Sequence, residues 1–180
     1  MNNTVTAHDL SFEIYISKEA IAQKVAEIGT QITKDYQNKN PLFIGILNGC
    51  FVFAADLMRA CDMDCEVSFI KIASYEGTTS TGKITTLIGL NADEVKGRDI
   101  IIMEDIIDTG KTLFKFLKDL KAMKPTSIAI ASLLLKPDAI QHPIPIDYLG
   151  FEIPNKFVIG YGLDYNGLGR NLEAIYQLKE

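Results

Sequence analysis

The stretch Arg98–Met123, RDIIIMEDIIDTGKTLFKFLKDLKAM, changes its hydrophobic period within a few residues and so decides the fold. The apolar run Ile100–Met103 is typical of a strand that is buried on both faces of a sheet. A turn-forming run, Asp108–Gly110, follows, and from Thr112 onward apolar residues recur at the i, i+3, i+4, i+7 spacing of one helix face. The stretch therefore predicts a strand, an acidic strand end, a tight loop and a helix.

This order of elements predicts a binding site at the loop. The loop is expected at the carboxyl end of a parallel strand, where open α/β sheets bind their ligands. The N–H groups of Thr109–Leu113 are expected at a helix N-terminus, and Gly110 allows the backbone to curl around an anion. Lys111 and the hydroxyl groups of Thr109 and Thr112 add donors, so a phosphate group is the expected ligand.

Two carboxylates, Glu104 and Asp105, follow the apolar run. They would repel a bare phosphate, so we expect them to bind sugar hydroxyls or a magnesium ion, for which carboxylate oxygens are suitable ligands. An ordinary strand end that reaches solvent is the alternative on these residues alone. The triplet Gly110–Thr112 does not form the phosphate-binding loop of nucleotide triphosphatases, because that motif needs a glycine where Asp105 stands.

The segment Glu104–Thr112, EDIIDTGKT, with the apolar strand before it, resembles the phosphoribosyl-diphosphate (PRPP) loop of the type I phosphoribosyltransferases, in the form found in hypoxanthine-guanine members. Nearly the whole chain can be matched to that family. The resemblance implies an α/β domain with a central parallel sheet flanked by helices, a small hood built from N-terminal and C-terminal segments, and a flexible lid loop. It also implies a magnesium-dependent purine-salvage enzyme that transfers the phosphoribosyl group of PRPP to N9 of hypoxanthine or guanine and releases pyrophosphate.

Length and composition limit the possible functions. The 180 residues, 47% of them hydrophobic, suit a single domain over residues 1–180. The net charge of −5 provides no basic field for nucleic acid, and the longest apolar runs are too short for a bilayer. Three cysteines without a secretory signal favour reduced thiols in the cytoplasm. We expect small-molecule substrates and, from the resemblance, a homodimer or homotetramer.

The first part of the chain predicts a second strand, loop and helix unit. Leu10–Ile16 alternates apolar and polar residues and predicts a short edge strand. Ser17 is expected to cap a helix whose apolar face includes Ile21–Ile32, and Leu42–Leu47 predicts the next strand. The loop that follows, Asn48–Cys50, should lie at the same sheet edge as the phosphate loop.

The resemblance gives this second loop a function. It implies that Leu47, Asn48 and Gly49 bind the pyrophosphate part of PRPP, although the family has a lysine at the position of Asn48, and the peptide bond before that residue is cis in relatives. An ordinary Asn-Gly turn is the alternative.

A polar stretch follows the strand predicted at Glu66–Ala73. Ser74–Lys83 is rich in glycine, serine and threonine, and a plain hairpin loop with Ile84–Leu90 as its second arm explains it. The resemblance implies instead that Ser74 and Tyr75 begin a lid that excludes water from a reactive sugar cation.

The last third of the chain predicts one more buried strand, Ile128–Leu135, and two short strands, Tyr148–Ile153 and Phe157–Gly160. We expect both short strands in the hood rather than in the main sheet. The glycine-rich tail Tyr161–Leu172 is not expected to contribute to a core.

The purine side of the site is assigned by the resemblance. It implies that Lys136 contacts the 6-oxo group of the base, that the ring of Phe157 stacks on the base, and that the backbone of Val158 contacts its edge. Asp164 is implied near the base and the metal ion, and Arg170 at the pyrophosphate. Taken alone, Lys136 could be a solvated lysine, Phe157 a core aromatic residue, and Asp164 with Arg170 a surface pair.

The chemistry is predicted to centre on Asp108, which can accept the N7 proton of the purine as the bond to N9 forms. The loop Asp108–Thr112 should hold the 5′-phosphate, and the metal ion is expected near Glu104, Asp105 and Asp164. The alternative is a regulator on the same fold that binds PRPP or nucleotides without turnover. The acid at position 108 and the lack of a basic module favour the enzyme.

Overall fold

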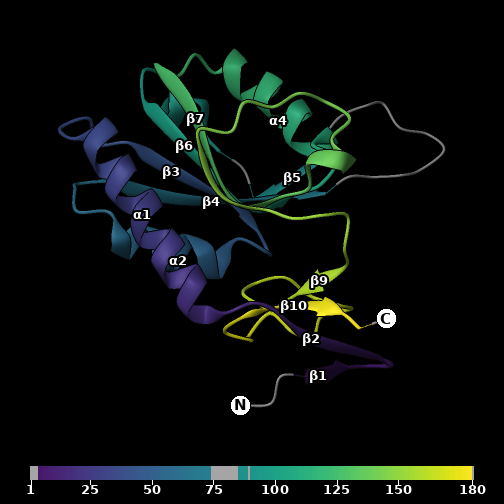
Figure 1. The fold of residues 1–180 in the computed structure, drawn as a ribbon. Helices are drawn as coiled ribbons and strands as arrows, with labels where there is room; N and C mark the ends of the chain where they lie inside the picture. Colours follow the sequence, from purple (N-terminus) through teal and green to yellow (C-terminus); the bar gives the residue numbers. More distant parts are fainter. Residues whose placement is uncertain (1–3, 74–84, 89, 180) are drawn as a thin grey trace, which may run out of the picture.

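The computed structural model describes residues 4–73, 85–88 and 90–179, and its largest element is a sheet of six strands in the order β5-β4-β3-β6-β7-β8 (Figure 1). The strands are β3 (Leu42–Leu47), β4 (Glu66–Ala73), β5 (Thr85–Ile88), β6 (Asp99–Ile107), β7 (Ser127–Leu135) and β8 (Tyr148–Glu152). All neighbours pair in parallel except β5, which is antiparallel to β4. The predicted central parallel sheet is confirmed.

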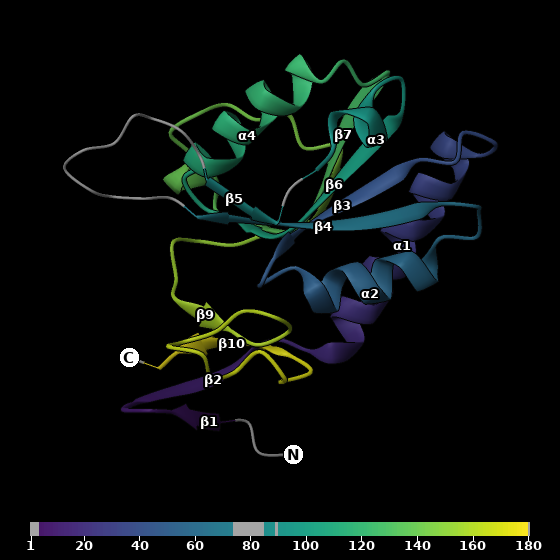
Figure 2. The same ribbon diagram turned by 180° about the vertical axis from the view of Figure 1, so that it is seen from behind.

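Helices cover both faces of this sheet. One face carries α1 (Lys18–Tyr36) and α2 (Phe51–Ala60), and the other carries α3 (Ala92–Val95) and α4 (Lys111–Ala122) (Figures 1 and 2). Each face has its own core of buried aliphatic and aromatic side chains. The sheet is therefore enclosed, as the continuous apolar runs of its strands require.

The sequence explains why the central elements form. Ile100–Met103 in β6 are all fully buried, as expected for a strand covered on both faces. The helix α1 begins after Ser17, whose hydroxyl accepts a hydrogen bond from the N–H of Ala20 at 3.2 Å. The predicted cap is confirmed, and it satisfies one of the free donors at the helix start.

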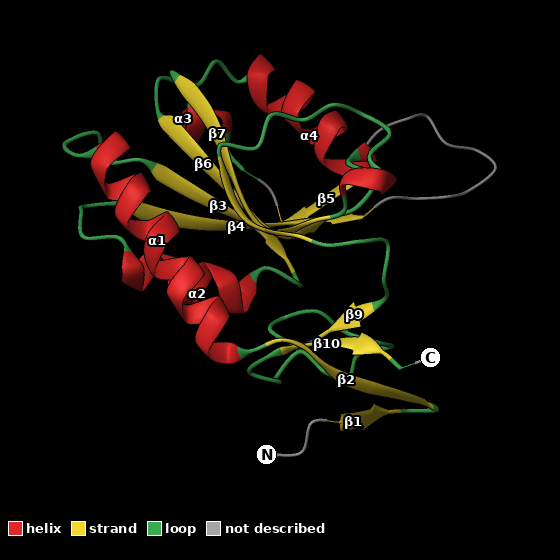
Figure 3. Ribbon diagram, viewed as in Figure 1, coloured by secondary structure: helices red, strands yellow, loops and turns green. Residues whose placement is uncertain are grey.

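A second, smaller sheet forms the hood, which lies below the main sheet in Figure 3. Its strands are β1 (Thr4–Ala7), β2 (Leu10–Ile16), β9 (Val158–Ile159) and β10 (Ile175–Leu178), in the order β1-β2-β10-β9. The strands are antiparallel and enclose a small core around Phe12 and Ile159. The two ends of the chain therefore meet in one sheet, as predicted.

Several predictions about single elements were wrong. The strand Leu10–Ile16 is an inner strand of the hood, because Thr4–Ala7 pairs with its outer side. Tyr148–Glu152 belongs to the main sheet, where it pairs in parallel with β7, so of the two predicted short strands only the second, Val158–Ile159, lies in the hood. β7 pairs with β6 along one edge, and its other edge would leave backbone N–H and C=O groups without partners. Tyr148–Glu152 pairs with that second edge and supplies the missing hydrogen bonds.

Two further expectations were corrected. β6 continues to Ile107, so Glu104 and Asp105 lie within the strand rather than after it. The glycine-rich tail contributes buried side chains, because Tyr161 and Leu163 pack into the core beneath α1 and α2.

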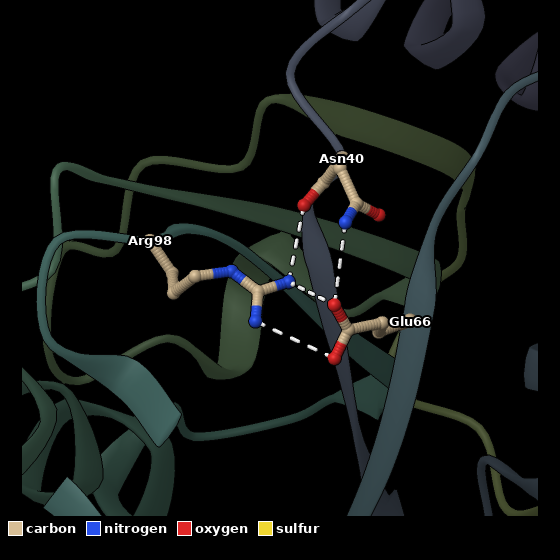
Figure 4. A network of polar contacts seen from close by, with 3 residues as sticks. All are labelled: Asn40, Glu66 and Arg98. Carbon is tan, nitrogen blue, oxygen red and sulfur yellow. Dashed lines mark hydrogen bonds and ion pairs between the residues drawn. The ribbon is translucent and has the colours of Figure 1, made fainter. Parts of the chain in front are cut away.

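A polar network fastens the amino ends of three neighbouring strands (Figure 4). Arg98, just before β6, donates to both carboxylate oxygens of Glu66 at the start of β4, at 2.9 and 3.4 Å. It also donates to the carbonyl of Asn40, just before β3, and the Asn40 amide donates to Glu66. This network lies at the edge of the sheet opposite to the carboxyl ends of the parallel strands.

None of the helices in the described residues combines the length and the apolar character needed to cross a membrane.

Candidate active site

Three strand ends position the candidate site. β3, β6 and β7 are parallel neighbours, so their carboxyl ends and the residues that follow meet at one sheet edge. β3 is followed by Asn48 and Gly49, β6 by Asp108, and β7 by Lys136. Below this edge lies the hood (Figure 1).

A cavity of about 340 Å³ opens between this edge and the hood. Most of its lining consists of predicted site residues, namely Gly49, Asp105, Asp108, Lys136, Phe157, Val158, Asp164 and Arg170. Ile106 and Leu163 also line it and were not predicted. Each of them is next in sequence to a predicted acid, so the strand and loop that present the acid also present the apolar neighbour.

The phosphate loop has the expected form. Gly110 is the N-cap residue of α4 and has a φ of +73°, a conformation that favours glycine. Glycine offers no capping side chain, so the N–H groups of Thr112 and Leu113 are available to an anion, whereas the N–H of Lys111 donates to the Thr109 hydroxyl at 3.4 Å. The loop is backed by the chain after Lys136: the N–H of Gln141 donates to the Thr109 carbonyl at 3.0 Å, and Ile144 packs against Gly110. Lys111 is exposed at the start of the helix.

The carboxyl groups of Glu104 and Asp105 are partly buried and both hold their protons more tightly than usual. Burial, with the neighbouring Asp105 charge, raises the pKa of Glu104 well above its ordinary value. Burial raises the pKa of Asp105 to about 6, although backbone hydrogen bonds and the Arg170 charge oppose the rise. A side chain at Gly49 would collide with the Asp105 carboxylate, so glycine there lets the loop after β3 approach β6 closely.

The residue types of Glu104 and Asp105 are compatible with the predicted magnesium ion, because carboxylate oxygens are ligands that magnesium accepts. Magnesium in proteins is often held by one or two carboxylates, with substrate phosphates and water completing the octahedron. Within residues 4–73 and 90–179, no group of three histidine, cysteine or acidic residues is close enough to hold a metal ion, so Asp164 does not join Glu104 and Asp105 in one cluster. The predicted metal set remains a prediction.

Asp108 and Lys136 form an ion pair at the cavity. The Lys136 Nζ lies 2.9 Å from the Asp108 Oδ2. Lys136 is only 7% exposed, whereas the Asp108 side chain is about half exposed. A lysine buried beside a carboxylate is not the solvated lysine of the alternative interpretation, because burial of an ammonium group requires a partner.

Asp164 and Arg170 also pair, and the hood backbone holds both. Arg170 Nη2 lies 2.6 Å from Asp164 Oδ1, and Arg170 Nη1 donates to the Gly162 carbonyl at 2.7 Å. The N–H of Gly167 donates to the second carboxylate oxygen of Asp164 at 2.7 Å. Both side chains are less than one third exposed, so they are not a solvated surface pair. Arg170 and Asp164 both line the cavity, and a planar guanidinium group is suited to bidentate contact with phosphate oxygens.

The remaining predicted residues differ in their placement. Phe157 is 42% exposed at the cavity, so it is not a core aromatic residue, and its ring centroid lies 5.7 Å from that of Tyr165. Val158 is buried, and its backbone pairs with β10. The Leu47–Asn48 peptide bond is cis, as the family resemblance implied, and Asn48 is exposed. The proposed lid residues at positions 74 and 75 lie outside the described residues.

Comparison with known proteins shows the family of this chain. The profile of the phosphoribosyl transferase domain family matches residues 12–166. The chain belongs to this family. Among relatives of the phosphoribosyl transferase family, a hypoxanthine-guanine phosphoribosyltransferase of Streptococcus pyogenes is 45% identical, over 93% of each chain. One of Lactococcus lactis is 44% identical, over 93% of this chain and 91% of that protein.

Solved structures of phosphoribosyltransferases have the same fold. A hypoxanthine phosphoribosyltransferase of Staphylococcus aureus superposes with a TM-score of 0.89 at 39% identity, over 99% of this chain and 97% of that one. A hypoxanthine-guanine phosphoribosyltransferase of Bacillus anthracis, with HEPES in its active site, gives 0.84 at 37% identity, over 93% of this chain and 98% of that one. The type I phosphoribosyltransferase fold and the assignment as a transferase follow from these matches.

Proposed function

We propose that this chain transfers the 5-phosphoribosyl group of PRPP to N9 of hypoxanthine or guanine, which gives IMP or GMP and pyrophosphate. The observation that carries the proposal is that an acid-lysine pair, an exposed aromatic ring and a partly buried arginine line one cavity, beside the loop that begins α4. The names of the relatives support the purine as the acceptor.

The reaction is a displacement at the anomeric carbon of ribose. The bond from that carbon to pyrophosphate breaks, the bond to purine N9 forms, and positive charge develops on the sugar between the two events. The loop Asp108–Thr112 would hold the 5′-phosphate away from the reacting bond, which supplies positioning. Arg170 and the backbone near Gly49 would bind the leaving pyrophosphate.

The purine would lie against Phe157, with its 6-oxo group near the Lys136 ammonium. Asp108 would then accept the proton that N7 loses as N9 forms its new bond. Glu104 and Asp105 would hold magnesium, which supplies neutralisation of the pyrophosphate charge when it is bound. Leu163 and Val158 form an apolar border that limits water at the base.

The experiment is a spectrophotometric assay with hypoxanthine or guanine, PRPP and magnesium. We expect turnover to IMP or GMP with equimolar pyrophosphate. Binding of PRPP without turnover of either base would favour the regulator instead. Competition between hypoxanthine, guanine and xanthine in the same assay ranks the acceptors.

We further propose a cytoplasmic location and a homodimer or homotetramer. Cys50, Cys61 and Cys65 are free thiols, which supports a reducing compartment. Light scattering coupled to size exclusion measures the mass in solution, and a mass equal to one chain would contradict the proposed oligomer.

A further inference from the structure

The proposed pyrophosphate side of the site is built from two separate parts of the fold. Gly49 belongs to the loop after β3 in the main domain, whereas Arg170 and Asp164 belong to the hood. The 5′-phosphate loop, by contrast, lies entirely in the main domain and is backed by main-domain residues. The affinity for pyrophosphate should therefore depend on the distance between the hood and the main domain. The affinity for the 5′-phosphate should depend on it much less.

The two parts touch through their backbones. Gly162 in the hood has a φ of +102°, and a side chain there would collide with the carbonyl oxygen of Gly49. Gly162 is also joined to Arg170 twice, because its N–H donates to the Arg170 carbonyl at 3.0 Å and its own carbonyl accepts from the guanidinium at 2.7 Å. Any shift of Gly162 would move Arg170 relative to Gly49.

The residue before this contact is fastened to the main domain. Tyr161 is only 5% exposed and packs in the core beneath α1 and α2. Its hydroxyl donates to the Asp56 Oδ2 at 2.6 Å, and Asp56 lies in α2, the helix that begins two residues after Gly49. The backbone N–H of Tyr161 donates to the Leu172 carbonyl at 2.8 Å, on the far side of the hood loop. In Figures 1 and 2 the hood lies below α2.

The protonation state of the Tyr161 hydroxyl fixes the direction of its hydrogen bond to Asp56. Burial and the Asp56 carboxylate both raise the pKa of the Tyr161 hydroxyl, so it keeps its proton and remains a donor. Asp56 also accepts from the exposed Arg59 at 2.8 Å, but through its other oxygen, so the Oδ2 that accepts from Tyr161 is not shared with Arg59.

We infer that Tyr161 is a positioning residue, whose bond to Asp56 sets the place of Arg170 relative to Gly49 and so completes the pyrophosphate site from two parts of the fold. The inference deepens the proposed function and rests on it. It distinguishes two ligands: inorganic pyrophosphate should need the link, and ribose 5-phosphate, which needs only the main-domain loop, should not.

The chain offers matched controls. The Tyr148 hydroxyl donates to the Asp35 carboxylate at 2.9 Å, a bond of the same kind between β8 and α1, away from the cavity. Tyr148→Phe therefore measures what the loss of such a bond does to stability alone. Arg59→Ala removes the other partner of Asp56 and leaves Tyr161 intact.

The experiment is calorimetric titration of the full chain with inorganic pyrophosphate and, separately, with ribose 5-phosphate, at one fixed magnesium concentration. For Tyr161→Phe we expect the Kd for pyrophosphate to rise about three- to tenfold, as for the loss of one hydrogen bond, with no change for ribose 5-phosphate. Asp56→Ala should give the same rise, and the double variant no more than either single one, because all three remove one link. Tyr148→Phe and Arg59→Ala should leave both affinities unchanged.

Thermal unfolding of each variant accompanies the titrations, so that Asp56→Ala, which leaves the core ring in place, carries the test if Tyr161→Phe is poorly folded. An unchanged Kd for pyrophosphate in Asp56→Ala would overturn the inference. So would an equal loss for both ligands, since that is the result of general destabilisation. If the unaltered protein binds ribose 5-phosphate and does not bind pyrophosphate, the proposed function itself is contradicted, and the inference is lost with it.

Discussion

At the scale of single residues, the Asp108–Lys136 pair combines two roles that the resemblance assigned separately. Lys136 is buried and Asp108 is half exposed, so the lysine fixes the carboxylate at the cavity while the carboxylate compensates the buried ammonium charge. A purine that binds with its 6-oxo group at Lys136 would therefore bring N7 towards Asp108. The geometry supports one residue for binding the base and its partner for accepting the proton.

The first prediction concerns Asp108→Asn. An amide cannot accept the N7 proton, so kcat should fall by about 10²- to 10⁴-fold, the usual value of general base catalysis. The KM for PRPP should change far less, because the loop amides that would hold the 5′-phosphate remain. Steady-state kinetics test this, with Asp119→Asn on the outer face of α4 as the control that keeps full activity. An unchanged kcat in Asp108→Asn would remove this residue from the chemistry.

The second prediction concerns Asn48, where the family resemblance implies a lysine. Asn48 is exposed beside the cavity, so a longer cationic side chain has room to reach towards the proposed pyrophosphate. Asn48→Lys should lower the KM for PRPP, and more so at low ionic strength, because salt screens exposed charges. The KM for the purine should stay constant. Assays at several salt concentrations test this, and PRPP kinetics that stay the same at every one would limit the role of this loop to its backbone.

At the scale of elements, the network of Arg98, Glu66 and Asn40 ties β6, β4 and β3 at the edge opposite to the site. Arg98→Ala should lower the free energy of unfolding by about 0.5 to 1.5 kcal/mol, since several charge-assisted bonds are lost from a partly exposed group. The kcat of the folded enzyme should not change. Urea unfolding measures the first effect and the activity assay the second.

The control for Arg98→Ala is Lys24→Ala, which removes a single ion pair within α1. Such exposed helix pairs contribute about 0.3 to 0.5 kcal/mol, so this variant should lose less stability. An equal loss in the two variants would mean that the strand network adds nothing beyond an ordinary surface pair.

The sequence predicted the elements of the main sheet well, because their hydrophobic periods are distinct. Its errors concern partners in space. Tyr148–Glu152 has the apolar character of a strand, but its position beside β7 depends on a twelve-residue connection whose path no local pattern fixes. β1 and β10 are short and weakly patterned, and they become strands because the two chain ends meet in the hood.

The site was predictable where a loop follows directly on a parallel strand. Asp108, Lys136 and Gly49 meet because strand topology brings the ends of β6, β7 and β3 together. The roles of Phe157 and Arg170 came only from the family resemblance, since hood residues reach the cavity through tertiary packing. The Tyr161–Asp56 bond was not foreseen, because it joins residues 105 positions apart that carry no motif.

At the scale of the whole molecule, the two carboxyl groups in β6 link stability to pH. The pKa of Asp105 is raised from its ordinary value near 4 to about 6, and that of Glu104 is also raised, chiefly by burial. An acid whose pKa is higher in the folded state binds more protons there than in the unfolded chain. Its contribution to stability is therefore full at low pH and is lost as pH rises through about 4 to 6.

Several surface acids contribute with the opposite sign. Hydrogen bonds lower the pKa values of Glu27 and Asp35, so their contribution is lost as pH falls. The pH dependence of the unaltered protein mixes both signs, and only a difference between variants isolates the strand pair.

The last prediction therefore compares Asp105→Asn with the unaltered protein in metal-free buffer. Between pH 4 and pH 7 the unaltered protein should lose about 1 to 3 kcal/mol of stability relative to Asp105→Asn. The reason is that only the unaltered protein has a carboxyl group at position 105, which must ionise while partly buried. Magnesium should then raise the Tm of the unaltered protein more at pH 8 than at pH 5, since a ligand that binds ionised carboxylates stabilises the fold only when they are ionised. Asp105→Asn should lose most of that gain at pH 8. Parallel pH profiles for the two proteins, together with an equal effect of magnesium at both pH values, would contradict this prediction. They would mean that folding does not raise the pKa of Asp105 and that Asp105 does not hold the metal.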